Sequence, residues 1–178
     1  TSLVGSEMCI RDSYPAAPAE QDPGAPTSTA PATEAPTENA IPAIASVYDP
    51  YGDGTENDEA IEAVIDGNSG TAWETEPYPD PLDETKAGVG IILEPPVPIG
   101  AIEVSGTPNT QFTIAWNATV PDVPGEWDRV GAAQILTGTT RLDVAHREEG
   151  FWLLWITALP QQADGNYGTS ISEIRLLP

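Results

Sequence analysis

The chain has 178 residues, with 28 acidic side chains, 6 basic ones and a formal net charge of −22. This charge argues against nucleic acid and anionic lipid as partners, because both are bound by clustered Lys and Arg. The chain has one Cys and one His, which argues against a zinc cage, a disulfide framework and a Cys/His nucleophile pair. No run of about 18 apolar residues occurs, so no membrane insertion is predicted within this chain.

The first 42 residues divide into two segments of different composition. Residues 1–13, TSLVGSEMCIRDS, resemble a translated sequencing-adapter fragment, and they carry the only Cys and the only Met; a genuine disordered or targeting segment is the alternative. Residues 14–42 contain 8 Ala, 7 Pro and 4 Thr. Such a segment buries too little apolar surface to fold, so we expect a disordered Pro/Ala/Thr-rich linker. It is either a spacer that holds a module away from a membrane or a frayed terminus.

Residues 43–178 carry the pattern of a folded domain made of short strands. The acidic loop 49–59 precedes one or two helical turns over 58–65, with Asp58 as a candidate N-cap, and Asp66-Gly67-Asn68 is a turn signal. The apolar run 151–157, FWLLWIT, predicts a central strand that is buried on both faces. Other strands are expected at 44–48, 89–93, 99–105, 111–116, 170–176 and, as one or two strands, within 134–145. Short strands with Gly and Pro turns indicate an all-β sandwich.

Five segments of this region resemble a discoidin-like, galactose-binding-like domain. They are ASVYDP, AVIDGNSGTAW, GIILEPPVPIGAIEVSG, FWLLWITALP and ISEIRLL. The resemblance implies a jelly-roll β-sandwich over residues 43–178. The DPYGDGTENDE loop, the TEPY segment and the WITALP ending further resemble one subgroup, the extracytoplasmic C-terminal domain of actinobacterial membrane proteins. These are Ser/Thr kinase-like proteins and MviN-type lipid II flippase proteins.

The resemblance also implies a structural calcium site at the turn that follows residue 65. Its ligands would be the carbonyl of Ala63, the carboxylate of Asp66, the carbonyl of Asn68, the carbonyl and hydroxyl of Thr71, and the carboxylate of Glu173. Ca²⁺ takes six to eight oxygen ligands, and this set suits it. The alternative is that Asp66 and Asn68 only cap the turn and that Glu173 is an ordinary exposed acid.

The acidic loop is a second candidate cation site. It contains Asp49, Asp53, Glu56, Asp58 and Glu59. The loop departs from the calcium loop of EF-hands, because the twelfth position counted from Asp49 is Ala60 and not Glu. We therefore interpret it as a solvated run of charges.

Four aromatic residues outside the apolar strands are candidates for ligand binding: Tyr51, Tyr78, Trp127 and Tyr167. Sugar rings stack on exposed aromatic faces, and binding residues of sandwich folds concentrate in loops. The alternative is that these rings clamp loops onto their own sheets. The other four tryptophans are expected in the core: Trp73, Trp116, Trp152 and Trp155.

Catalysis has little support in the sequence. His146, the only His, lies among charged residues in HREE, and no Ser/His/Asp order can be assigned around it. No pair of carboxylates is marked by an apolar setting that would raise one pKa. The sequence therefore predicts a binding protein and not an enzyme.

The resemblance implies a non-catalytic, extracytoplasmic module that binds cell-wall glycan or a peptidoglycan precursor. We expect it to be tethered at the cell surface through a missing upstream membrane segment of a kinase-like sensor or flippase-type protein. One alternative is a docking module for other proteins of the cell envelope. Another is a carbohydrate-binding appendage of a secreted hydrolase.

Overall fold

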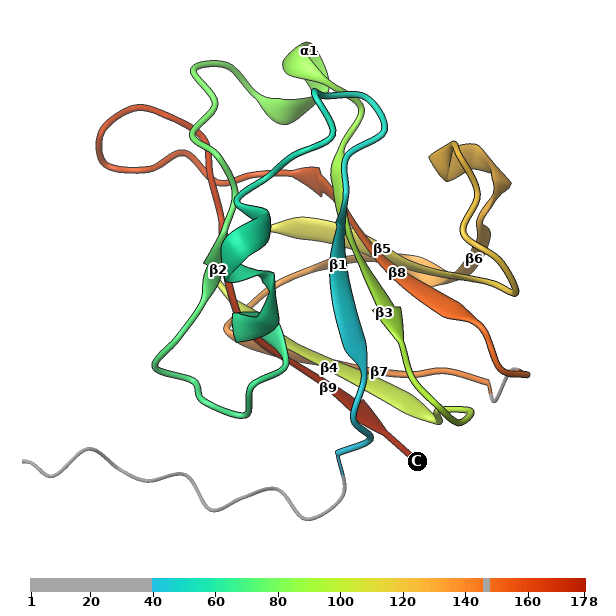
Figure 1. Cartoon of the computed structure of the whole chain (residues 1–178). Helices are drawn as coiled ribbons and strands as arrows, with labels where there is room; N and C mark the ends of the chain where they lie inside the picture. Colours follow the sequence, from blue (N-terminus) through green and yellow to red (C-terminus); the bar gives the residue numbers. More distant parts are fainter. Residues whose placement is uncertain (1–39, 146–147) are drawn as a thin grey trace, which may run out of the picture. The chain divides into compact units, whose positions relative to one another are not determined.

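The computed structural model describes residues 40–145 and 148–178, which form two antiparallel sheets packed face to face (Figure 1). The five-stranded sheet has the order β1 (Ile44–Tyr48), β3 (Val89–Glu94), β8 (Phe151–Ala158), β5 (Gln111–Asn117), β6 (Asp128–Ile135). The four-stranded sheet has the order β2 (Trp73–Glu74), β9 (Ser170–Leu177), β4 (Ala101–Gly106), β7 (Thr139–Asp143). Three short helical segments complete the fold: η1 (Asp58–Val64), α1 (Leu82–Thr85) and η2 (Pro124–Glu126). The predicted all-β sandwich is confirmed.

Strand β8 shows why one apolar run lies at the centre of the fold. It pairs with β3 on one side and with β5 on the other. Trp152, Leu154 and Ile156 point into the main core between the sheets, and Leu153 and Trp155 belong to a second apolar cluster. Because side chains alternate along a strand, this second cluster lies on the outer face of the five-stranded sheet. The prediction that β8 is buried on both faces is confirmed.

The tryptophans divide between these two clusters. Trp73 and Trp152 are fully buried in the main core, as predicted. Trp155 is buried in the outer cluster, and Trp116 is partly buried against the main core.

One predicted segment, 134–145, forms two strands in different sheets. β6 begins at Asp128, earlier than predicted, and is an edge strand of the five-stranded sheet, whereas β7 is an edge strand of the other sheet. The turn at Thr137-Gly138 therefore connects the two sheets and does not close a hairpin. The early part of β6 was missed because its sequence, DRVGAAQI, is largely exposed and lacks a regular apolar alternation.

The predicted helical turns exist as the 3-10 helix η1, but Asp58 is not its N-cap. Asn57 is at that position, with a left-handed φ of 52°. Asp58 lies in the first turn and accepts a hydrogen bond from the backbone N–H of Glu56 at 2.8 Å. The short elements β2 and α1 were not predicted, because two to four residues carry no periodic pattern.

The start of the folded part differs slightly from the predicted boundary at residue 43. Ile41, placed by the sequence in the linker, donates a backbone hydrogen bond to the Leu176 carbonyl at 2.7 Å. Residues 1–13, residues 14–39 of the predicted linker and His146 lie outside the described residues. In the part of the chain that is described, no helix is long and apolar enough to cross a membrane.

Candidate functional site

A cleft of about 280 Å³ lies beside the end of β2, between the connection from β4 to β5 and the connection from β8 to β9. We call it the loop cleft. It is lined mainly by hydroxyl, amide and carboxylate side chains, together with one aromatic ring. The lining residues used below are Glu74, Thr107, Gln162, Asp164, Asn166 and Tyr167.

The connection from β8 to β9 is closed on itself by backbone bonds. The N–H of Gln162 donates to the carbonyl of Asn166 at 2.7 Å, and the N–H of Gly165 donates to the carbonyl of Gln162 at 3.0 Å. Gly165 has a φ of +93°, a conformation that disfavours other residues. The side chain of Gln162 donates to the carbonyl of Gly168 at 2.6 Å. The loop therefore presents a fixed wall to the cleft.

Tyr167 is joined to the segment that follows β2. Its N–H donates to the Tyr78 carbonyl at 2.7 Å, and the N–H of Tyr78 donates back at 2.9 Å. A side-chain bond holds the opposite side of the cleft. The hydroxyl Oγ1 of Thr107 accepts a hydrogen bond from the backbone N–H of Ser170 at 3.0 Å. The walls of the loop cleft are thus held by bonds that are independent of any ligand.

Two carboxylates line the cleft and differ in how they are held. Asp164 accepts hydrogen bonds from the backbone N–H of Asn166 at 3.0 Å and from its Nδ2 at 2.9 Å. These two bonds lower the pKa of Asp164, so it is ionised at neutral pH. Glu74 is exposed, and its carboxylate makes no hydrogen bond or ion pair to any residue that the structure describes.

The four predicted ligand-binding aromatics do not form one site. Tyr167 lines the loop cleft and is half-buried. Tyr51 is 49% exposed and lies elsewhere, with its ring 6.3 Å from that of Trp155.

Tyr78 and Trp127 are both buried, which favours the alternative that these rings clamp loops onto the domain. Tyr78 is only 7% exposed, because its ring packs in the main core and its hydroxyl donates to Glu56 Oε2 at 2.6 Å. Trp127 is 6% exposed, because it covers the outer cluster with its ring edge-on to Tyr48. It lines a separate hollow of about 300 Å³ with Trp155 and Arg129.

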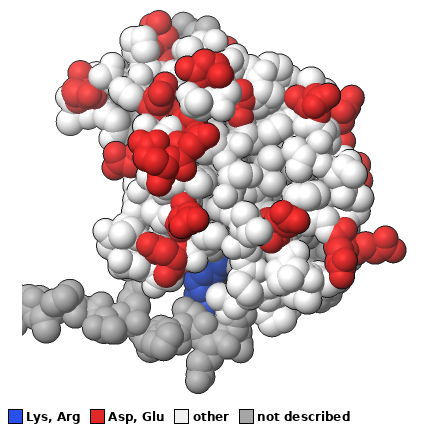
Figure 2. All heavy atoms as spheres, in the orientation of Figure 1, with Lys and Arg blue, Asp and Glu red and all other residues white. Residues whose placement is uncertain are grey.

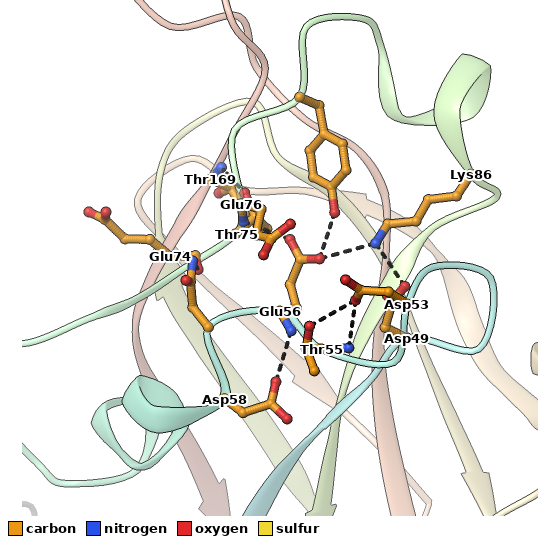
Figure 3. A network of polar contacts seen from close by, with 12 residues as sticks. Asp49, Asp53, Thr55, Glu56, Asp58, Glu74, Thr75, Glu76, Lys86 and Thr169 are labelled. Atoms are coloured by element: carbon orange, nitrogen blue, oxygen red, sulfur yellow. Dashed lines mark hydrogen bonds and ion pairs between the residues drawn. The ribbon is translucent and has the colours of Figure 1, made fainter.

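The acidic loop is only in part the solvated run of charges that we expected, because Asp53, Asp58 and Glu59 are exposed whereas Asp49 and Glu56 are buried. The carboxylates of Asp49 and Glu56 are fully buried, and the ammonium of Lys86 lies 2.8 Å from Asp49 Oδ1 and 3.0 Å from Glu56 Oε2 (Figure 3). Glu56 Oε1 accepts from the N–H of Glu76 at 2.7 Å. This buried network joins the acidic loop to α1 and to the segment after β2.

The buried network shifts the pKa values of its members. Burial opposes the charge of Lys86, but its bonds to Asp49, Tyr78 and Glu56 outweigh burial and raise its pKa. Burial and the bond to the Glu56 carboxylate raise the pKa of Tyr78. Lys86 therefore stays charged and Tyr78 neutral over the physiological range.

Three of the predicted calcium ligands lie together. Asp66 Oδ1 accepts from the N–H of Asn68 at 2.8 Å, and Thr71 Oγ1 lies 2.7 Å from both Asp66 Oδ2 and the Asn68 carbonyl. Ala63 lies on η1 and Glu173 on β9, and these two elements contact each other. Within the described residues, no group of three or more His, Cys, Asp or Glu side chains could hold a metal ion.

Sequence reasoning missed most of the loop cleft. Glu74, Thr107, Gln162, Asp164 and Asn166 were not identified, because they come from three segments far apart in the chain. The one available signal was the Asp164-Gly165-Asn166 turn directly before Tyr167.

Solved structures with the same fold include carbohydrate-binding modules. The chitosan-binding module 1 from a chitosanase/glucanase of Paenibacillus sp. IK-5 matches with a TM-score of 0.52 and 16% identity, over 79% of this chain and 98% of that one. The module CpGH89CBM32-5 of Clostridium perfringens, solved with GalNAc-β-1,3-galactose, matches with a TM-score of 0.51 and 15% identity, over 78% and 99%.

A larger protein also contains this fold. A GH29 fucosidase of Ruminococcus gnavus, solved with fucose, matches with a TM-score of 0.53 and 14% identity, over 76% of this chain. The match spans 25% of the fucosidase chain. No model of a known protein family matches the sequence. The chain thus has the discoidin-like, galactose-binding-like β-sandwich fold of these modules, which confirms the predicted fold.

Proposed function

We propose that the chain is a non-catalytic carbohydrate-binding module and that its loop cleft holds the sugar. The observation that carries this proposal is the composition of the cleft, which is lined by Thr, Gln, Asn, Asp and Glu residues together with the half-buried Tyr167. Such groups bind sugar hydroxyls, and an aromatic ring packs against the apolar face of a sugar. The cleft volume of about 280 Å³ is near the lower end of the range for small-ligand sites. The two full-length structural matches, named for chitosan and solved with GalNAc-β-1,3-galactose, support this ligand class.

The state of Asp164 supports binding rather than hydrolysis. A glycosidase needs a carboxyl group with a raised pKa as its general acid. Both oxygens of Asp164 accept hydrogen bonds from Asn166, and its pKa is lowered. This carboxylate is therefore suited to accept hydrogen bonds from a ligand and not to donate a proton.

The test is capture of the chain on insoluble cell-wall material, with and without prior protease treatment of the wall. Binding that survives protease treatment and is competed by soluble wall saccharides supports a glycan ligand. Binding that is lost with the protease contradicts it and supports the alternative of a docking module for envelope proteins.

We propose further that the glycan is cell-wall polysaccharide or a peptidoglycan precursor and that the module is extracytoplasmic and membrane-tethered. The resemblance to domains of kinase-like and flippase-type membrane proteins supports this setting, as does the Pro/Ala/Thr-rich segment 14–42. Sequencing of the gene upstream of residue 14 tests it. A membrane-spanning segment preceded by kinase motifs or many spans supports the proposal, and a signal peptide with a hydrolase domain contradicts it.

A second candidate function is a carbohydrate-binding appendage of a secreted hydrolase. It is favoured by the match to the fucosidase, of which this chain spans a quarter. The same upstream sequence decides between the two settings. The sugar-binding role of the loop cleft is common to both.

We also propose that the turn 66–71 holds a structural Ca²⁺ through Asp66, Asn68 and Thr71, with Ala63 and Glu173 completing the site. All of these ligands are oxygens, which suits Ca²⁺. Thr71 Oγ1 has one hydrogen but lies 2.7 Å from two acceptors, Asp66 Oδ2 and the Asn68 carbonyl. One of these two oxygen pairs therefore has no hydrogen between its atoms. A bound cation would offset the repulsion between those two oxygens. When bound, the ion would supply rigidity to the turn.

A further inference from the structure

We propose that the loop cleft prefers a protonated amino sugar over neutral and anionic sugars; this inference rests on the proposed function. The cleft is lined by the carboxylates of Glu74 and Asp164, and none of its lining residues is Lys, Arg or His. A sugar with a free amine carries a positive charge and three N–H donors at neutral pH. Its ammonium fits a cleft whose only charged groups are hydrogen-bond acceptors.

The two carboxylates reach the cleft from different parts of the fold. Glu74 ends the short strand β2, which is fixed to β9 by the pairing of Glu74 with Ser170. Asp164 belongs to the connection between β8 and β9 and is oriented by its two bonds from Asn166. One acceptor is therefore rigid and the other is free to turn toward a ligand. No described residue bonds to the Glu74 carboxylate, so a ligand could bind it without breaking an existing hydrogen bond or ion pair.

The basic side chains that the structure describes do not neutralise the cleft. Lys86 is held by Asp49 and Glu56 in the buried network. Arg141 and Arg175 both pair with Glu103 in the four-stranded sheet. Arg129 lies on β6 in the other sheet and lines the separate hollow beside Trp127. No described basic side chain pairs with either cleft carboxylate, so a cationic ligand would not have to displace one.

The charge of the whole chain acts in the same direction. The formal net charge is −22, and Asp and Glu far outnumber Lys and Arg on the visible face (Figure 2). A negative potential attracts cationic sugars and repels uronic acids and sulfated sugars, and salt weakens both effects. The preference should therefore be largest at low ionic strength.

The test compares four monosaccharides of similar ring shape: glucosamine, N-acetylglucosamine, glucose and glucuronic acid. Each is titrated into the full chain at neutral pH and low salt, and the affinity is followed by NMR chemical shifts. We expect glucosamine to bind roughly 2–10-fold more tightly than glucose, from two exposed charge pairs. Glucuronic acid should bind more weakly than glucose. The advantage of glucosamine should shrink in high salt and at a pH that deprotonates its amine.

Two substitutions remove the cleft charges with little change of shape, Glu74→Gln and Asp164→Asn, and they are made singly and together. The double variant should bind glucosamine and glucose about equally. Asp128→Asn on β6, an exposed acid outside the cleft, is the charge-matched control and should keep the preference. If neutral sugars bind the cleft and glucosamine has no advantage, the inference is wrong while the proposed function stands. If neither these sugars nor wall oligosaccharides bind, the proposed function fails and the inference fails with it.

Discussion

Lys86 donates a hydrogen bond to Glu56 Oε2 at 3.0 Å, although 30 residues separate the two in the sequence. The side chain of Lys86 is 7% exposed and that of Glu56 is fully buried. The same ammonium also bonds to Asp49, so one cation serves two buried carboxylates. This arrangement turns the acidic loop into a structural part of the domain.

Replacing Lys86 by Met should strongly destabilise the fold. The substitution leaves Asp49 and Glu56 buried without a positive charge, and breaking one side of a buried pair costs about 3–5 kcal/mol. Urea unfolding followed by tryptophan fluorescence measures the change. Arg141→Met, which breaks the surface pairs of Arg141 with Glu103 and Asp143, is the control and should leave the free energy of unfolding nearly unchanged. Equal effects of the two substitutions would contradict the structural role of the buried network.

Tyr78→Phe should also destabilise the chain, and the loss should depend on pH. Removal of the hydroxyl deletes its bond to the Glu56 carboxylate, at a cost of roughly 1.5–3 kcal/mol for a bond to a charged group. The pKa of Tyr78 is raised in the folded state, so its stabilisation is fully present below about pH 10, the pKa of an unfolded Tyr, and is lost as the pH rises above that value. The gap in stability between wild type and variant should therefore narrow in alkali. A gap that is constant up to pH 11 or that widens there would refute this account.

Gly106→Ala should destabilise the side of the loop cleft where β4 approaches β9. A Cβ at Gly106 would clash with the Ser170 carbonyl oxygen, which is backbone and cannot turn away. Such overpacking costs about 1–3 kcal/mol. Gly125→Ala is the matched control, because a Cβ there meets nothing within 4 Å. The melting temperatures of both variants measure this effect. If Gly106→Ala melts at the temperature of the wild type, β4 and β9 do not approach each other closely at this position.

Removal of calcium should lower the melting temperature if the turn 66–71 holds the proposed ion. A ligand that binds only the folded state stabilises it, so EDTA should lower the melting temperature and added Ca²⁺ should restore it. Asp66→Ala should abolish that response. Asp53→Ala in the acidic loop is the control and should keep it. A calcium-loaded chain whose melting temperature does not respond to EDTA would rule out the structural ion.

The strands of the sandwich were predictable from local patterns, and the site was not. The apolar run of β8 and the runs around β3 and β9 identify strands because their burial follows from a few neighbouring residues. The role of Glu56 depends on Lys86, which a local pattern cannot pair with it. The burial of Tyr78 could not be read from a local pattern for the same reason, since its partner Glu56 lies 22 residues away.

The loop cleft illustrates the same limit. Tyr167 was identified because an aromatic residue in a loop is an unusual signal. Glu74 is a polar residue with no local signature, and only the pairing of β2 with β9 brings it to the cleft. Sequence reasoning thus found the aromatic part of the site and missed the carboxylates that determine its charge.

The central claim is that the loop cleft binds sugar, and an NMR titration of the full chain with wall-derived oligosaccharides tests it most directly. We expect the amide signals of Thr107, Asn166 and Tyr167 to shift together, and Tyr167→Ala to weaken binding about tenfold, since loss of ring contacts is worth about 1.4 kcal/mol. Tyr51→Ala, which alters an exposed ring beside Trp155, should bind as the wild type does. Shifts that cluster instead around Tyr51 and Trp155, or equal binding by the wild type and Tyr167→Ala, would contradict the assignment of the cleft.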